Sequence, residues 1–428
     1  MTELNGGERS EGVLRERNRV RVVDALRRQG MASRSDLARM TGLSRTTVGS
    51  LVADLQARGL VVEHVDGDRQ HGRGRPPIVL RLDRSAGVAV GIDFDHDRVR
   101  VALADLSSTV LGEDCAEIDV DHSAGDAIDA AVEMVEALRR SAGVDVAQLV
   151  GAGVGLPGPI DRRTGEVGSA VILPGWAGLP ARETLGERLG LDVQVDNDAN
   201  LGALAEASFG AGRGLSDVVY VRLGSGLGAG LVIGGRLHHG AAGLAGEIGH
   251  VQVNPYGALC RCGNRGCLET IASEGAIRAL LRPGRSDDLT RGDLLELVAA
   301  GDLGATRVVN DAGLAIGRVL ADLCNAVNPE AVVVGGELSE AGEPLLGGIR
   351  DAIDRYALPG AADVVRVVHG ELGERAEVLG ALALVTQSPE VPRWIGLETV
   401  VECGSAASGG RAAWRPAGRK EAVHAETR

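Results

Sequence analysis

The spacing of apolar residues changes once along this chain of 428 residues, near residue 85. Before that point, apolar side chains recur at helical spacing in short segments, and two strand-like segments follow. After it, runs rich in Val, Leu and Ala alternate with helical segments and end in glycine clusters. This pattern predicts a small helical unit followed by an α/β body with mixed sheets and two lobes.

The first unit is predicted to contain three helices. Residues 13–30 form the first helix, Ser33 begins the second with a capping-box-like sequence, and Ser44 caps the third. Gly42 supplies a tight turn between the last two helices. Three short helices with such a turn are typical of a helix-turn-helix.

A hairpin follows the helices. Residues 60–65 and 77–82 are strand-like, and the stretch between them is too rich in glycine and charge to pack, which suits a wing lying along a DNA groove. The expected DNA contacts come from the helix-turn-helix and the wing, namely Arg34, Ser44, Arg45, Thr46, Thr47, Arg73 and Arg75. The alternative is that these arginines form an ordinary solvated face of a protein-docking domain.

The charge distribution also separates the two parts. Residues 1–84 contain 16 arginines and 11 acidic residues, a net charge of +5, whereas residues 85–428 carry −19. A basic unit can approach phosphates, and an acidic body is repelled by them. The chain has only eight aromatic residues, too few for base-stacking platforms. It has no long apolar run and no signal-peptide pattern, so we expect a soluble, cytoplasmic protein with no membrane partner.

Three of the six cysteines lie close together. Cys260, Cys262 and Cys267 follow His250 within one glycine-rich loop. Three thiolates and one imidazole satisfy tetrahedral zinc and leave no position for water, so we expect a structural zinc ion. The alternative is a set of reduced loop thiols without a metal.

Two segments carry a family resemblance. The sequence G-E-I-G-H at 246–250 is followed by C-R-C-G-N-R-G-C-L-E at 260–269, and together with the glycine clusters they resemble the ROK family of repressors and sugar kinases, in its repressor branch. The resemblance implies a two-lobed actin/hexokinase-like body with a sugar and nucleotide cleft. The expected divisions are a winged helix-turn-helix domain at 13–84, a body at 85–386 (lobe 1 about 85–198 plus 373–386, lobe 2 about 199–372) and a disordered tail at 387–428.

The resemblance also implies a set of sugar-binding residues. Five polar residues match the family's sugar contacts, namely Asn197, Asp198, Glu247, His250 and Glu269. In kinases of the family, the matching aspartate is the general base that deprotonates the sugar hydroxyl. Taken alone, the Asn-Asp pair is also a helix N-cap for residues 199–209. For His250 we expect one ring nitrogen on the metal and the other free to bond the sugar.

The phosphate motif of the kinase branch is altered. Where that branch has Asp-x-Gly-Gly-Thr, residues 93–97 are Asp-Phe-Asp-His-Asp, so Asp95 and Asp97 replace the glycine and the threonine. Carboxylates in a partly desolvated cleft repel phosphates. A second glycine turn at 223–228 is retained, and it is also explained as a tight turn between strands. We therefore expect no kinase activity, with Asp198 as a vestigial base.

These features predict a sugar-responsive DNA-binding regulator, a repressor of carbohydrate metabolism genes. A homodimer or homotetramer would place two winged helices on a near-palindromic operator. One alternative is an ATP-dependent sugar kinase with a DNA-binding arm. A second is a scaffold that responds to a phosphorylated or protein partner. The sequence specifies neither the sugar nor the operator.

Overall fold

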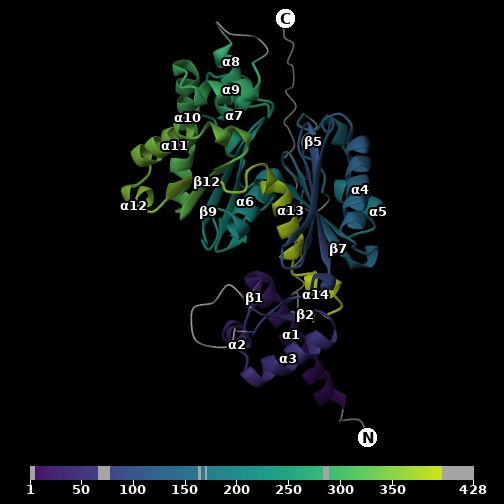
Figure 1. The fold of residues 1–428 in the computed structure, drawn as a ribbon. Coiled ribbons are helices and arrows are strands. Elements are labelled where there is room, and N and C mark those ends of the chain that lie inside the picture. The colour runs from purple at the N-terminus through teal and green to yellow at the C-terminus, as the bar shows by residue number, and fades with distance from the viewer. Residues whose placement is uncertain (1–4, 66–77, 162–164, 169–170, 283–288, 398–428) are drawn as a thin grey trace, which may run out of the picture.

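The fold consists of one small unit and two larger lobes (Figure 1). It is seen in a computed structural model that describes residues 5–65, 78–161, 165–168, 171–282 and 289–397. In Figure 1 the small N-terminal unit lies below the two lobes, and each lobe contains its own sheet. None of the helices in these ranges is both long and apolar enough to cross a membrane.

The N-terminal unit is a winged helix-turn-helix, as predicted. Ser33 caps the second helix with a complete capping box, and Ser44 caps the third. Gly42, at φ +68°, ends the second helix in the left-handed conformation that glycine adopts without strain. Its elements are α1 (Asn5–Gln29), β1 (Met31–Ala32), α2 (Arg34–Thr41), α3 (Arg45–Ala57), β2 (Val61–Val65) and β3 (Ile78–Leu82), with strand order β1-β3-β2.

The first lobe contains a five-stranded sheet of order β6-β5-β4-β7-β8. Strands β4, β5 and β6 pair antiparallel, whereas β4, β7 and β8 run parallel. The helix predicted at 124–141 is α4, which packs against β5 and β6. The elements are η1 (Arg84–Ala86), β4 (Val88–Phe94), β5 (Arg98–Asp105), β6 (Val110–Glu117), α4 (Ala124–Ser141), η2 (Val146–Gln148), β7 (Leu149–Leu156), η3 (Pro174–Trp176), α5 (Ala181–Leu189) and β8 (Val193–Asn197).

The second lobe repeats this topology. Its sheet, of order β11-β10-β9-β12-β13, has three antiparallel strands followed by two parallel ones, as in the first lobe. The elements are β9 (Val218–Leu223), β10 (Leu227–Ile233), β11 (Arg236–Leu237), η4 (Ile248–His250), α7 (Glu269–Ala272), α8 (Glu274–Leu281), α9 (Arg291–Ala299), α10 (Leu303–Val327), β12 (Ala331–Gly335), η5 (Glu337–Ala341), α11 (Glu343–Tyr356), α12 (Pro359–Ala362) and β13 (Arg366–His369). The chain then returns through η6 (Gly373–Arg375), which pairs with β5 and β6 of the first lobe. The predicted two-lobed α/β fold is confirmed.

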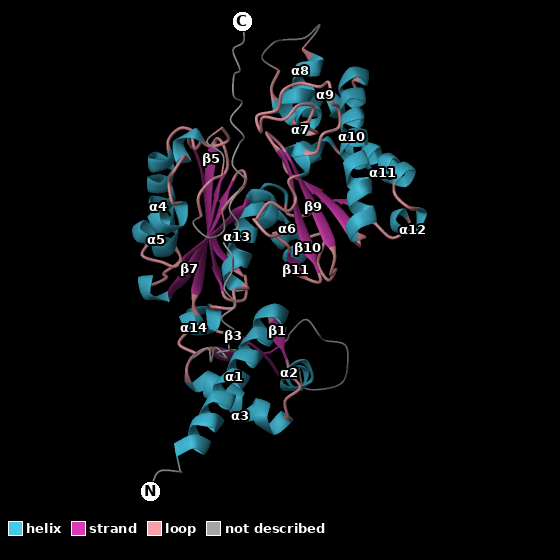
Figure 2. Ribbon diagram, turned by 180° about the vertical axis from the view of Figure 1, so that it is seen from behind, coloured by secondary structure: helices cyan, strands magenta, loops and turns pink. Residues whose placement is uncertain are grey.

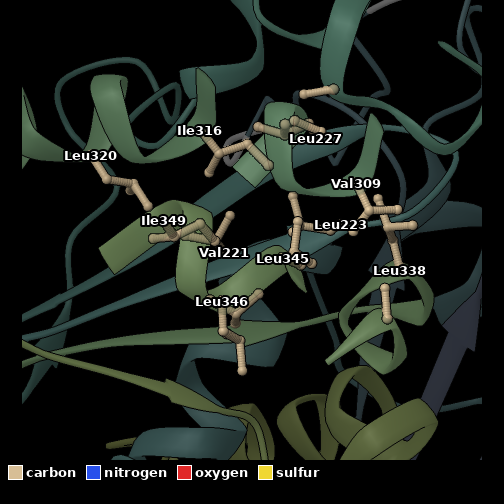
Figure 3. Close-up of a cluster of buried hydrophobic side chains, with 14 of the residues drawn as sticks. Val221, Leu223, Leu227, Val309, Ile316, Leu320, Leu338, Leu345, Leu346 and Ile349 are labelled. Carbon is tan, nitrogen blue, oxygen red and sulfur yellow. The ribbon is translucent and has the colours of Figure 1, made fainter. Parts of the chain in front are cut away.

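The core of the second lobe lies between its sheet and two long helices (Figure 3). Val221 on β9 faces Ile316 on α10 and Ile349 on α11, and all three side chains are fully buried. Few aromatic residues are available, so branched aliphatic side chains fill this space. The burial of each such side chain stabilises the folded state by about 1.5–3 kcal/mol.

Two helices lie between the sheets (Figure 2). These are α6 (Asp198–Phe209) and α13 (Ala376–Thr386), which pack closely against each other. The sequence placed residues 387–428 in a disordered tail, but residues 387–397 are described and contain α14 (Val391–Trp394). Val391 and Leu397 are buried in the same apolar cluster as the N-terminal unit, a long-range contact that a short local segment does not predict. The rest of the expected tail lies outside the described residues.

Candidate functional site

A cleft between the lobes collects the polar residues singled out in the sequence. Asn197 and Asp198 come from the junction of β8 and α6, whereas Glu247, His250 and Glu269 come from the second lobe. All five line one cavity. Pro157 and Gly158, beyond the end of β7, form part of its wall.

The Asn-Asp pair begins α6. The Asn197 side-chain oxygen accepts hydrogen bonds from the amides of Ala199 (2.9 Å) and Asn200 (3.3 Å), and its amide group donates to the Gly158 carbonyl (2.8 Å). The N-cap alternative therefore holds, and Asn197 lines the cleft as well. Asp198 is 9% exposed, which leaves its carboxylate at the cleft surface.

The two glutamates differ in their partners. Glu269 forms a bidentate pair with Arg261, with both N–O distances at 2.9 Å, and also accepts from the Leu227 amide (3.3 Å). Glu247 is half-buried, and burial together with the nearby charges of Asp198 and Glu269 raises its pKa. Glu247 is therefore the carboxylate more available to a ligand.

Four side chains beside the cleft are close enough to share a metal ion. The ligand atoms of His250, Cys260, Cys262 and Cys267 all lie within 4.8 Å of one another. The Cys262 and Cys267 sulfurs are 3.7 Å apart, close to the edge of about 3.8 Å expected for a tetrahedron with Zn–S bonds of about 2.3 Å. The geometry and the donor set both fit a tetrahedral ion.

His250 connects this cluster to the cleft. Its Nδ1 lies 3.6 Å from the Cys260 sulfur, and its Nε2 lies 3.8 Å from a carboxylate oxygen of Glu247. Gly246, at φ +96°, precedes these residues, and a Cβ there would lie 1.8 Å from the Ala229 carbonyl oxygen. The close backbone approach fixes the loop that carries Glu247 and His250.

A buried ion network borders the cleft, and sequence reasoning missed its central residue. Arg222 on β9 is 7% exposed and contacts four carboxylates. The signal was a single charge within the apolar strand V-V-Y-V-R-L at 218–223. Its partners, with nitrogen–oxygen distances of 3.3–3.6 Å, are Asp95, Asp198, Glu337 and Glu377.

The altered phosphate motif lies in this network, with one correction. Asp95 is buried, and although burial raises its pKa, the Arg222 charge and a hydrogen bond from the His96 amide outweigh that effect and lower it to about 2. The Asp97 side chain, between β4 and β5, is 80% exposed and is not among the residues that line the cleft. The expectation that both carboxylates lie where phosphates would bind was therefore wrong for Asp97, and arginine pairing offsets the charge of Asp95.

The helix-turn-helix presents its predicted residues at the start of α3. Ser44, Arg45 and Thr46 are exposed, and Ser44 also caps the helix by accepting from the Thr47 amide (3.1 Å). Arg34 on α2 forms an ion pair with Glu63 on β2 at 2.7 Å. The predicted wing residues Arg73 and Arg75 lie outside the described residues.

Two protein-family models match this chain, one over the lobes and one over the N-terminal unit. The model described as "ROK family" matches residues 89–388, which is more than half of the chain. The chain belongs to the ROK family. A second model, described as "MarR family", matches residues 15–72, the helix-turn-helix part of this ROK protein.

Individual relatives of this ROK protein include both regulators and kinases. The chain is 30% identical to a protein named xylose repressor from Caldicellulosiruptor bescii, over 87% of this chain and 96% of the relative. It is 36% identical to a glucokinase from Halalkalibacterium halodurans, over 70% of this chain and 94% of the relative. A crystal structure of a ROK family transcriptional regulator, described as a homolog of the E. coli MLC protein, matches with a TM-score of 0.73 and 27% identity, over 89% of this chain and 99% of that chain.

Proposed function

We propose that this ROK protein is a sugar-responsive DNA-binding transcriptional repressor whose effector binds in the cleft between the lobes. The observation that carries the proposal is the convergence of Asn197, Asp198, Glu247, His250 and Glu269 on one cavity, in a chain that also has a winged helix-turn-helix. Convergent carboxylates and amides suit the hydroxyl groups of a sugar. The repressor named above is similar to this chain over the winged unit and the lobes together.

The cleft favours an uncharged sugar over a sugar phosphate. Arg222 is already shared among four carboxylates, and Arg261 forms a bidentate pair with Glu269. Asp198 and Glu247 add negative charge at the cleft surface. A phosphate would therefore meet carboxylates without an unpaired cation among the lining residues described here, which is costly in a partly desolvated site.

The cleft does not act as a kinase site in this proposal. Asp95 replaces a glycine of the kinase phosphate motif, and the Arg222 guanidinium lies 3.4 Å from Asp198. Phosphoryl transfer needs space beside Asp198 for the phosphates and their metal ion. A sugar kinase with a DNA-binding arm remains the second candidate because of the glucokinase relative.

A structural zinc ion completes the proposed site. His250, Cys260, Cys262 and Cys267 would supply all four ligands, leaving no open position for water. The ion would hold the loop that carries Glu247 and His250 against the cleft. It supplies no chemistry to a ligand.

DNA binding is assigned to the domain at residues 13–84. Arg45, Thr46 and Thr47 would face the major groove, Arg34 the DNA backbone, and the wing arginines at 73 and 75 the minor groove. A homodimer or homotetramer would place two such domains on one operator. The body at 85–386 would supply the effector cleft.

Thermal unfolding tests the effector assignment. The full chain is heated with D-xylose, D-glucose, D-glucose 6-phosphate or ATP, because a ligand that binds only the native state raises the unfolding midpoint with concentration. We expect a rise with at least one free sugar and none with ATP, and the Asp198→Asn variant should lose it. A rise with ATP, or sugar-dependent release of ADP, would support the kinase instead.

A further inference from the structure

The helix α13 contacts functional regions at both of its ends. Near its start, Glu377 accepts hydrogen bonds from Arg222 and from the Tyr220 hydroxyl, each at 3.3 Å. Just beyond its end, the carbonyl oxygens of Ser388 and Gln387 accept from the Arg27 guanidinium of α1, at 2.6 and 3.4 Å. In Figures 1 and 2, α13 lies between the two sheets and runs toward the N-terminal unit. Through Arg222, which lines the cleft, and through Arg27, it connects the cleft with the DNA-binding unit.

At the cleft end, Arg222 connects a proposed effector contact to α13. Its Nη1 lies 3.4 Å from Asp198, its Nη2 lies 3.4 Å from Asp95, and its Nε bonds Glu377. One guanidinium divides five N–H donors among these carboxylates. A ligand hydroxyl that donates to Asp198 therefore competes with Arg222 and changes how Arg222 is shared among its other partners.

Between its ends, α13 is packed without free space. A Cβ on Gly380 would lie 2.0 Å from the Leu201 carbonyl oxygen of α6. A Cβ on Gly153 of β7 would lie 2.0 Å from the Ala381 carbonyl oxygen. Because both faces of the helix meet backbone directly, a displacement at one end is passed along the helix rather than absorbed by side chains.

At the other end, the DNA-binding unit is attached firmly. The Arg27 side chain is 4% exposed and also pairs with Asp24 at 3.0 Å. Val391 and Leu397, after α13, are buried in one apolar cluster with Val22 of α1. A shift of residues 387–397 therefore acts directly on α1.

We propose that α13 transmits effector occupancy to the DNA-binding unit, with Arg222 and Glu377 as positioning residues at one end and Arg27 at the other. The nature of the effector rests on the proposed function, but the link from Asp198 to α1 does not. A change at Asp198 redistributes Arg222 between Asp95 and Glu377, and α13 carries the resulting shift to the carbonyls that bind Arg27.

Hydrogen exchange measured by mass spectrometry on the full chain tests this link without any effector. Asp198→Asn keeps the side-chain shape but removes the charge that Arg222 contacts. We expect exchange in α1 near Arg27 and in residues 387–397 to change by at least about threefold. Adding Glu377→Gln should abolish this long-range effect, so that the double variant resembles Glu377→Gln alone.

Two further variants make the result decisive. Asp129→Asn removes an exposed ion pair with Arg188 in the same lobe and should leave exchange in α1 unchanged. Arg222→Lys retains the charge but not the shape of the guanidinium, and should reproduce the change in α1 if Asp198→Asn fails to fold. If Asp198→Asn and Arg222→Lys both fold, and hydrogen exchange in each changes only around the cleft, the proposal is overturned.

A sugar provides a separate comparison. Whichever of D-xylose and D-glucose raises the unfolding midpoint should also alter exchange in α1 in the wild type, but not in Glu377→Gln. A sugar that binds and leaves α1 unchanged contradicts the transmission. Failure of every sugar to bind contradicts the proposed effector instead, and the Asp198→Asn comparison then decides the transmission by itself.

Discussion

At the scale of single residues, the site divides into a part the sequence predicts and a part it does not. Asn197, Glu247 and His250 stand in local motifs, so a short stretch of chain identifies each of them. Arg222 lies in no such motif, because its role depends on carboxylates that only the folded chain brings near it. Its sole sequence signal is that a charge interrupts an apolar strand.

Glu377 should make the free energy of unfolding depend on pH. Burial raises its pKa from 4.5 to about 7, against the opposing charge of Arg222. Between pH 5 and 7 the unfolded chain has lost this proton and the folded chain still binds it, so stability falls as the pH rises. We expect the free energy of unfolding of the wild type, relative to Glu377→Gln, to fall by about 1–3 kcal/mol over that range.

Urea unfolding at several pH values measures this difference. Asp95, with a pKa of about 2, stays ionised throughout the range and does not contribute to it. Glu187→Gln, at an exposed position of α5, is the control and should follow the wild type. If the free energies of unfolding of the wild type and of Glu377→Gln change with pH in parallel, the pKa of the buried Glu377 carboxyl is not raised.

The cysteine cluster gives a second prediction at this scale. Elemental analysis of the purified wild type should find about one zinc per chain. Cys262→Ser removes one of the four ligands and should lose most of the metal during dialysis against a chelator, with a lower unfolding temperature. Cys115→Ser, at an exposed cysteine of β6 outside the cluster, should keep its zinc. A folded wild type without metal contradicts the assignment.

At the scale of elements, capping residues predicted where α2 and α3 begin, whereas the first helix, predicted at 13–30, begins earlier, at Asn5. Ser33 and Ser44 begin α2 and α3 as expected, because a cap acts on its own helix. The helix α14 was missed because it is only four residues long, and its burial depends on α1, far away in the sequence. The placement of α13 between the lobes is likewise a tertiary property that no local pattern specifies.

The packing of α13 predicts an unusual response to alanine. Alanine normally stabilises a helix relative to glycine by about 1 kcal/mol. Gly380→Ala should instead destabilise the protein by about 1–3 kcal/mol, because its Cβ would meet the Leu201 carbonyl. Gly49→Ala in α3 is the matched control, since a Cβ there meets nothing within 4 Å. Urea unfolding compares them, and equal stabilities for the two variants would show that α13 has room to move.

At the scale of the whole molecule, two lobes of the same topology enclose a cleft, and a winged helix is attached through α13 and α14. The sequence predicted the two lobes and the winged unit from their alternating patterns and from the family resemblance. It did not predict how the winged unit meets the body, because Arg27 and Ser388 are separated by most of the chain. In the transmission proposed above, that contact links the cleft to the DNA-binding unit.

The proposed DNA contact of Arg45, at the exposed start of α3, is tested by substitution. An operator is first selected from random-sequence DNA with the full chain. Arg45→Ala should then weaken operator binding by about 1–3 kcal/mol in fluorescence anisotropy titrations, because one base or phosphate contact is lost. Arg188→Ala, at another exposed arginine, should leave the affinity unchanged. Equal operator affinities for the wild type and Arg45→Ala would show that Arg45 does not contribute to DNA binding.

The most direct test compares the operator affinity of the wild type with and without a saturating sugar that raises its unfolding midpoint. Coupling between the cleft and the winged helix predicts a change of about 5- to 150-fold, corresponding to about 1–3 kcal/mol. Removing the Arg222–Glu377 pair with Glu377→Gln should reduce that ratio toward one while sugar binding persists. An operator affinity that stays the same while the sugar is bound to the wild type would contradict the account.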